Sequence, residues 1–159
     1  MNVIRVSSTL RPLPLHPVCF RSNESFEVNP VALSVEDQLA IQQLYAKYNH
    51  ALDFGNVEGW VATFTPDGTF ASGANSFKGG EQLAAFATGF SSRMKARHWT
   101  NNLIVEADGD GASGTCYLQL LNVADPKTPT VLTTAIYKDS LTKTADGWRF
   151  TSRAVTADS

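Results

Sequence analysis

The stretch RHWTNNLIVEADGDGA, residues 97–112, decides the fold of this chain. Before it, apolar residues recur at the three- and four-residue spacing of amphipathic helices. Within it the spacing changes to two, which is typical of a β-strand, and the Asp- and Gly-rich end of the stretch predicts a tight turn. The chain therefore divides at this point into a helical first part and a β-rich last part.

Three more strands are predicted after this turn, over residues 111–123, 129–141 and 147–157. Turns rich in Asp, Gly and Pro separate them, so strands that are consecutive in the chain are expected to pair antiparallel. Helices followed by a meander of this kind indicate the α+β class. A long sheet twists and curls, and helices laid across its concave face would enclose a hollow.

Three helices are predicted before the sheet. The longest begins after Ser34, which is expected to be its N-cap, and ends near Asp53. A shorter helix is predicted over residues 57–64 and a third over residues 80–94. Between them, Pro66-Asp67-Gly68 predicts a turn that leads into a short strand.

Length and composition are those of one small domain. The chain has 159 residues, of which 43% are hydrophobic, enough for one core of ordinary size. We expect this domain over residues 34–156, with an irregular, proline-rich extension at 1–33 and a short tail at 157–159. The two cysteines, Cys19 and Cys116, make no disulfide framework, which favours a reducing, cytoplasmic location.

Charge and hydropathy argue against two classes of partner. The 13 Lys and Arg residues and 15 Asp and Glu residues give a formal charge of -2, and no basic run is present to bind nucleic acid. No apolar run reaches the ~18 residues that a membrane span needs, so a membrane is not expected as a partner. The three histidines and two cysteines show no metal-ligand spacing, so no metal site is expected.

Four segments in this order resemble a known family. Along the chain they are YNHALDFGN (residues 48–56), WVATFTPDGTF (60–70), the opening stretch (97–112) and DGWRFTSR (146–153). Over residues 34–156 the chain resembles the SnoaL-like branch of the nuclear transport factor 2 (NTF2-like) superfamily. The resemblance implies a cone of three N-terminal helices packed on a strongly curved, mainly antiparallel sheet that encloses a hydrophobic pocket.

The dehydratase-like members of this branch suggest catalytic residues. In them a tyrosine and an aspartate, five residues apart, face a histidine at the start of a central strand; the matching residues here are Tyr48, Asp53 and His98. A histidine can move a proton near neutral pH, a carboxylate can orient it, and a tyrosine can donate to a carbonyl. The resemblance implies a cofactor-independent lyase or isomerase, with dehydration of a hydroxylated polyketide-like, aromatic or steroid-like carbonyl compound as the first expectation.

Other interpretations of the same residues stay open. His98 can be an ordinary hydrogen-bonded histidine, Asp53 can cap the turn after its helix, and Tyr48 can be a core aromatic. Because one superfamily fold hosts many activities, the chain could instead be a non-catalytic ligand-binding or assembly subunit related to the small subunits of ring-hydroxylating dioxygenases. An epoxide hydrolase is a further alternative, but the Asp-Arg-Asp arrangement of that branch is not located in the sequence.

The pocket is predicted from alternation and from aromatic content. Strict alternation places Asn102 on the strand face of His98, so both are expected to face the hollow as substrate-binding groups. A small-molecule site is usually lined by apolar side chains with a few polar ones, which suggests a hydrophobic ligand. The aromatic residues expected to line it are Phe64, Phe70, Phe86, Phe90 and Tyr117.

Two further expectations concern the sheet. An apolar outer face that includes Trp99 or Trp148 would need covering, and members of the family commonly pair, so a homodimer is expected. Arg149 and Arg153 alternate with Trp148 and Phe150 on the last strand and are expected to be solvated.

Overall fold

The computed structural model describes residues 32–158 as three helices and six strands. The elements in chain order are α1 (Val35–Asp53), α2 (Val57–Val61), β1 (Phe64–Ser72), β2 (Asn75–Lys78), α3 (Gly79–Arg93), β3 (Ala96–Asp108), β4 (Gly111–Asn122), β5 (Thr130–Thr144) and β6 (Gly147–Ala157). The predicted helices, the predicted meander and the α+β class are confirmed. None of the helices described here is long and apolar enough to cross a membrane.

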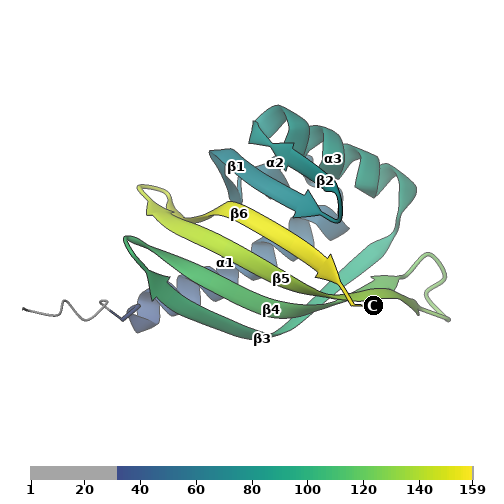
Figure 1. Cartoon of the computed structure of the whole chain (residues 1–159). Helices are drawn as coiled ribbons and strands as arrows, with labels where there is room; N and C mark the ends of the chain where they lie inside the picture. The colour runs from purple at the N-terminus through teal and green to yellow at the C-terminus, as the bar shows by residue number, and fades with distance from the viewer. Residues whose placement is uncertain (1–31, 159) are drawn as a thin grey trace, which may run out of the picture.

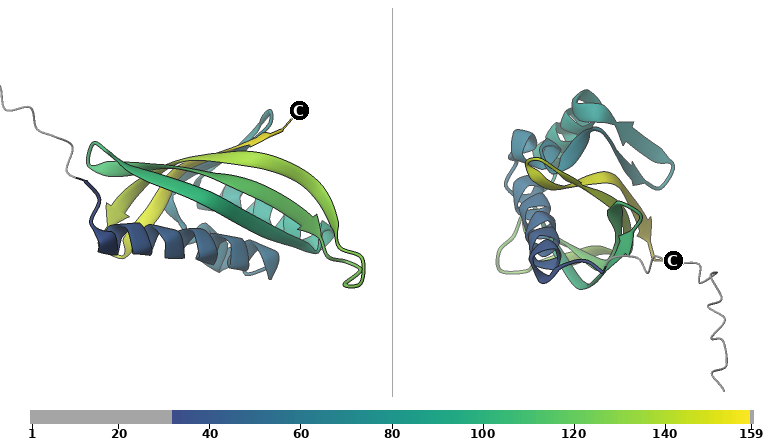
Figure 2. Two further views of the ribbon diagram at one scale, coloured as in Figure 1. Left: turned by 90° about the horizontal axis from the view of Figure 1, so that it is seen from below. Right: turned by 90° about the vertical axis from the view of Figure 1, so that its left-hand side faces the viewer.

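The strands form one open, curved sheet in the order β2-β1-β6-β5-β4-β3. Neighbouring strands pair antiparallel, except that β1 and β6 run parallel. The sheet arches over α1, while α2 and α3 close the side that carries β1 and β2 (Figures 1 and 2). This arrangement is the cone that the resemblance implied, with β2 and β3 as its two edge strands.

The start of α1 is hydrogen-bonded to the end of β5 and the start of β6. The Ser34 hydroxyl accepts the Asp37 backbone N–H at 3.1 Å, as expected of an N-cap. The Asp37 carboxylate accepts hydrogen bonds from Lys143 and from the Trp148 indole, both at 2.8 Å. These bonds, with one from Ser34, lower the pKa of Asp37 to about 2. Trp148 is consequently 5% exposed, so the expectation that it lies on the outer face is wrong.

Two parts of the first strand pair differ from the prediction. β1 begins at Phe64 and continues through the predicted turn at 66–68, which is an irregularity inside the strand where the register with β6 shifts. A Cβ at Gly68 would lie 2.9 Å from the Phe64 Cβ, so the backbone folds back closely there. The short strand β2 was not predicted, because four residues are too few to show a period.

The described residues can be compared with the predicted domain limits at each end of the chain. The irregular extension expected for residues 1–33 lies outside the described residues, apart from 32 and 33. At the other end β6 continues through Ala157, so the predicted tail begins within the last strand.

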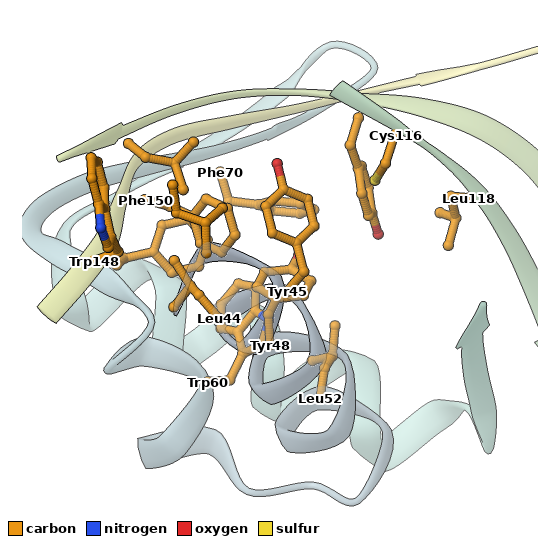
Figure 3. Packing of buried hydrophobic residues seen from close by; sticks show 14 of the residues in the cluster. Leu44, Tyr45, Tyr48, Leu52, Trp60, Phe70, Cys116, Leu118, Trp148 and Phe150 are labelled. Atoms are coloured by element: carbon orange, nitrogen blue, oxygen red, sulfur yellow. The ribbon is translucent and has the colours of Figure 1, made fainter. Parts of the chain in front are cut away.

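The core of the cone is filled by aromatic rings. Trp60 of α2 packs on Phe64 with ring centroids 5.1 Å apart, and Phe70 of β1 packs on Phe86 of α3 at 4.7 Å. Figure 3 shows α1 contributing Leu44, Tyr45, Tyr48 and Leu52 to this cluster from below, with Cys116 and Leu118 of β4 above. Rings at these distances and tilts are in contact, so helices and sheet are joined by a packed interior.

Candidate active site

The end of α1 meets the start of β3 through Asp53 and His98. Oδ1 of Asp53 lies 2.5 Å from Nδ1 of His98, and Oδ2 accepts the backbone N–H of His98 at 3.0 Å. The two side chains are 6% and 5% exposed. The predicted contact between them is confirmed. A carboxylate at Nδ1 holds the proton on that nitrogen, which leaves the lone pair of a neutral imidazole on Nε2.

The local sequence explains why Asp53 is available for this contact. α1 ends at Asp53 because Gly55 adopts the left-handed φ of +72°, which favours glycine. The α1–α2 turn is then capped by Asn56, whose Oδ1 accepts the Gly59 backbone N–H at 2.9 Å. Since Asn56 supplies that cap, both carboxylate oxygens of Asp53 are directed to β3.

His98 lines an open cleft of about 580 Å³ between α1 and β3. Within residues 32–158 the lining of the cleft combines polar and apolar groups, and none of the lining residues is Asp, Glu, Lys or Arg. The lining consists of Gln42, Tyr45, Ala46, Asn49, His50, His98, Trp99, Thr100, Asn101 and Leu103. The cleft can therefore contact an uncharged ligand through apolar surface and through hydrogen bonds.

A second hydrogen bond joins the same helix and strand. Nδ2 of Asn49 donates to Oγ1 of Thr100 at 2.8 Å, and Asn49 is 7% exposed. Sequence analysis did not single out either residue. The spacing of these residues could have indicated the contact. Asn49 precedes Asp53 by one helical turn and Thr100 follows His98 by two strand positions, so each lies on the same face as its neighbour in the site.

Tyr48 lies in the core and apart from this pair. α1 is regular through Asp53, so the two side chains project roughly 140° apart at 3.6 residues per turn. The Tyr48 ring is fully buried and packs on Trp60 at 5.3 Å. Its hydroxyl has no hydrogen-bond partner within residues 32–158, and burial raises its pKa to about 12. The expected meeting of Tyr48 with His98 and Asp53 therefore does not occur.

A bulge moves Asn102 off the face that His98 occupies. The register between β3 and β4 shifts between Asn101 and Ile104, and Asn102 adopts a φ of 53° with its side chain exposed. Strict alternation places Leu103 on the face opposite His98. The bulge instead brings Leu103 to the face of His98, where it lines the cleft. The expectation that Asn102 faces the hollow is wrong, because alternation holds only up to the bulge.

Tyr117 also lies away from the predicted pocket. It falls between Cys116 and Leu118, which are 1% and 4% exposed, while Tyr117 is 53% exposed. Alternation in β4 therefore turns Tyr117 to the outer face of the sheet. Its expected place in the lining is wrong.

The four predicted phenylalanines belong to the packed interior and none lines the cleft. Phe64 and Phe70 are each 4% exposed, and Phe86 is packed against both Phe70 and Trp60. Phe90 packs on the His98 imidazole, with ring centroids 5.5 Å apart. Phe90 therefore supports the catalytic candidate from the core side, and the other three fill the cone.

Comparison with known proteins identifies the family. The model of the SnoaL-like domain matches residues 33–154. The chain belongs to the SnoaL-like domain family. This family includes polyketide cyclases and dehydratases. The curated proteins give no significant match to the chain.

Solved structures agree with this assignment. A function-unknown protein from Mycobacterium tuberculosis has a TM-score of 0.73 and 29% identity, with 77% of this chain and 72% of that chain covered. ActVI-ORFA from Streptomyces coelicolor has a TM-score of 0.70 and 28% identity, with 76% and 96% covered. An NTF2-like protein with a cystatin-like fold from Novosphingobium aromaticivorans, at a TM-score of 0.71, 24% identity and coverage of 77% and 82%, shows the same fold.

The SnoaL-like domain contains a second buried pair, formed by Arg153 and Asp139 and sealed in the core. Arg153 is 1% exposed, so its expected solvation is wrong. Its Nε and Nη2 donate to the two carboxylate oxygens of Asp139 at 2.8 and 2.7 Å, and the Tyr45 hydroxyl donates to the same carboxylate. The guanidinium carbon lies 4.1–4.6 Å from four ring centroids, those of Tyr45, Tyr48, Tyr137 and Phe150.

A bulge explains why Arg153 faces inward. Ser140 pairs with Ser152 but Leu141 pairs with Phe150, so Thr151 is an extra residue and the alternation of β6 moves by one. Burial acts to lower the pKa of Arg153, and the attraction and hydrogen bonds of Asp139 raise it well above its usual value. Within residues 32–158 Arg153 pairs with one carboxylate, so the Asp-Arg-Asp arrangement of an epoxide hydrolase is not formed there.

Neutralising Asp139 should destabilise this SnoaL-like domain strongly. Asp139→Asn leaves the Arg153 charge buried without its partner, and we expect the free energy of unfolding to fall by roughly 3–5 kcal/mol. Urea denaturation followed by circular dichroism measures the loss. The exposed Asp110→Asn is the matched control and should change stability by less than about 0.5 kcal/mol. Wild-type stability in Asp139→Asn would contradict a structural role for the pair.

Proposed function

We propose that this SnoaL-like domain is a cofactor-independent small-molecule lyase or isomerase, with dehydration of a hydroxylated carbonyl compound as its reaction. One observation carries the proposal: an imidazole oriented by a carboxylate lines an open cleft that can admit a ligand. A histidine held in one tautomer by a carboxylate is a common form of general base. Family membership agrees with this chemistry, since the SnoaL-like family includes dehydratases.

The proposed reaction is a proton abstraction followed by loss of water. Nε2 of His98 removes a proton from the carbon next to the substrate carbonyl, and the C–H electrons form an enolate. Asp53 stabilises the imidazolium that results. The enolate re-forms the carbonyl as the β-carbon–oxygen bond breaks, and His98 returns the proton to the departing hydroxyl. One water leaves, the product is a conjugated carbonyl compound, and His98 regains its starting state.

Neutral polar groups supply the remaining interactions. Gln42 lines the cleft, and its side-chain amide can donate to a carbonyl oxygen that gains charge. Tyr48 takes no part in the proposal, because its hydroxyl lies in the core. We therefore propose an uncharged ligand that has apolar surface, as expected from the sequence, and that also makes hydrogen bonds.

Replacing His98 should remove turnover while the fold is kept. The test substrate is the tetralone that carries a hydroxyl group β to its ketone, because loss of water gives α-naphthol, which fluoresces. We expect His98→Gln to lower kcat by roughly 10²–10⁴-fold, and Asp53→Asn to lower it less because the imidazole is still present. Fluorescence assays give the rate, and thermal denaturation checks that each variant is folded.

The control variant is His16→Gln, which replaces a histidine outside the described residues and should keep wild-type turnover. A folded His98→Gln protein with wild-type turnover would contradict the mechanism. A wild type that binds the tetralone without converting it, or any of a panel of β-hydroxy ketones, would favour the non-catalytic binding subunit.

We also propose that the protein forms a homodimer through the outer face of its sheet. Trp99, Ile104 and Tyr117 are 59%, 58% and 53% exposed, and a groove of about 480 Å³ on this face is lined in part by Tyr117 and Ile136. Large exposed apolar groups that lie close together usually mark an interface, and a two-fold pair is the commonest way to cover them.

Sedimentation velocity at micromolar concentration tests the homodimer. The wild type should sediment as a dimer, and Tyr117→Lys should shift it towards monomer because a charge would be buried without a partner. Val35→Lys is the control, since Val35 is 68% exposed but lies on α1. A wild type that is monomeric under these conditions would end the proposal.

A further inference from the structure

We infer that Asn49 and Thr100 are positioning residues that hold His98 and Asp53 in register across the cleft. Their effect on rate rests on the proposed function, whereas their effect on the His98 imidazole does not. Neither residue is given a role in proton transfer. Their contribution is to fix the distance and direction between helix α1 and strand β3.

Two side-chain contacts, each called a rung below, join α1 to β3 like the rungs of a ladder. Asp53 bonds to His98 at the C-terminal end of α1, and Asn49 bonds to Thr100 one helical turn earlier. On the strand the two contacted residues are two positions apart, so they lie on one face. Within residues 32–158 these are the side-chain hydrogen bonds that join α1 to β3. Two rungs fix rotation as well as separation, which one rung cannot do.

The His98–Asp53 rung needs this support because both of its ends are weakly held. Asp53 is the last residue of α1, and helix ends fray. His98 lies on β3, an edge strand whose one partner is β4. Asn49, in contrast, lies a full turn inside the helix and is more than nine-tenths buried. The second rung therefore connects a more rigid part of α1 to the strand.

Thr100 occupies the position where β3 loses its regular pairing. Register with β4 is continuous from Ala96 to Asn101 and then shifts at the bulge around Asn102. A bulge locally disrupts the ladder and bends the strand. An anchor at Thr100 separates the regular segment that carries His98 from that irregularity, so motion of the bulge is not passed to the imidazole.

The first test is spectroscopic and needs no substrate. Nitrogen NMR of histidine-labelled protein, at a pH where imidazoles are neutral, should show His98 in the tautomer protonated on Nδ1. In Thr100→Val, which keeps side-chain shape but removes the acceptor of the Asn49 bond, the spectrum should shift to a mixture of both tautomers. Thr100→Ser keeps the hydroxyl and should restore the wild-type spectrum. Thr134→Val, at an exposed strand position, is the control and should not change it.

The second test is kinetic and uses the β-hydroxy tetralone. Thr100→Val should lower kcat by roughly tenfold, about the effect of one lost hydrogen bond, with KM changed by less than about twofold. Asn49→Leu should do the same, and combining both changes should add little, because they remove one interaction.

A wild-type imidazole spectrum in Thr100→Val would overturn the inference, as would fully additive losses in the double variant. Absence of turnover in the wild type would count against the proposed function alone, because the tautomer shift in Thr100→Val would still support the positioning role.

Discussion

The buried ion pair between Arg153 and Asp139 constrains the rest of the structure. A guanidinium at 1% exposure is tolerable only with a carboxylate bonded to it, and here the bonding is bidentate. Tyr45 donates to the same carboxylate and Tyr48 covers the guanidinium, so α1 is fixed to the centre of β5 and β6. With its first turn also tied to the sheet through Asp37, the helix is fixed at its start and middle, and its last residue, Asp53, lies at the start of β3.

The pairs Arg153–Asp139 and His98–Asp53 differ in what they can do. Arg153 and Asp139 have side chains with no exposed surface, so a ligand cannot reach them without opening the core. His98 and Asp53 are almost as buried, yet the imidazole forms part of the wall of a cleft. Proton transfer needs a group within hydrogen-bond reach of the substrate. Stability and chemistry are therefore assigned to different pairs, both of which depend on the same helix.

Local patterns were sufficient to predict the architecture, and the resemblance to dehydratase-like members supplied the contact between His98 and Asp53. A cap at Ser34 followed by helical spacing, and a change of period after α3, depend on neighbours in sequence. Errors came where a bulge changed the phase of a strand. Asn102 was placed inward and Arg153 outward by strict alternation, and one extra residue in each strand reverses both assignments. Tyr48 could not be assigned to core or site, because a buried aromatic on α1 fits both patterns and only the packing around Arg153 decides.

The central claim is that His98, oriented by Asp53, removes a proton from the carbon next to a carbonyl. The most direct test is the exchange of that carbon-bound hydrogen for deuterium. The substrate is α-tetralone itself, which lacks a leaving hydroxyl, so proton removal is followed by return of a solvent deuteron in heavy water. Proton NMR should show the protein accelerating exchange at the carbon next to the ketone, and His98→Gln should return the rate to that of buffer. Exchange at the buffer rate with the wild type, or unchanged acceleration by His98→Gln, would contradict the account.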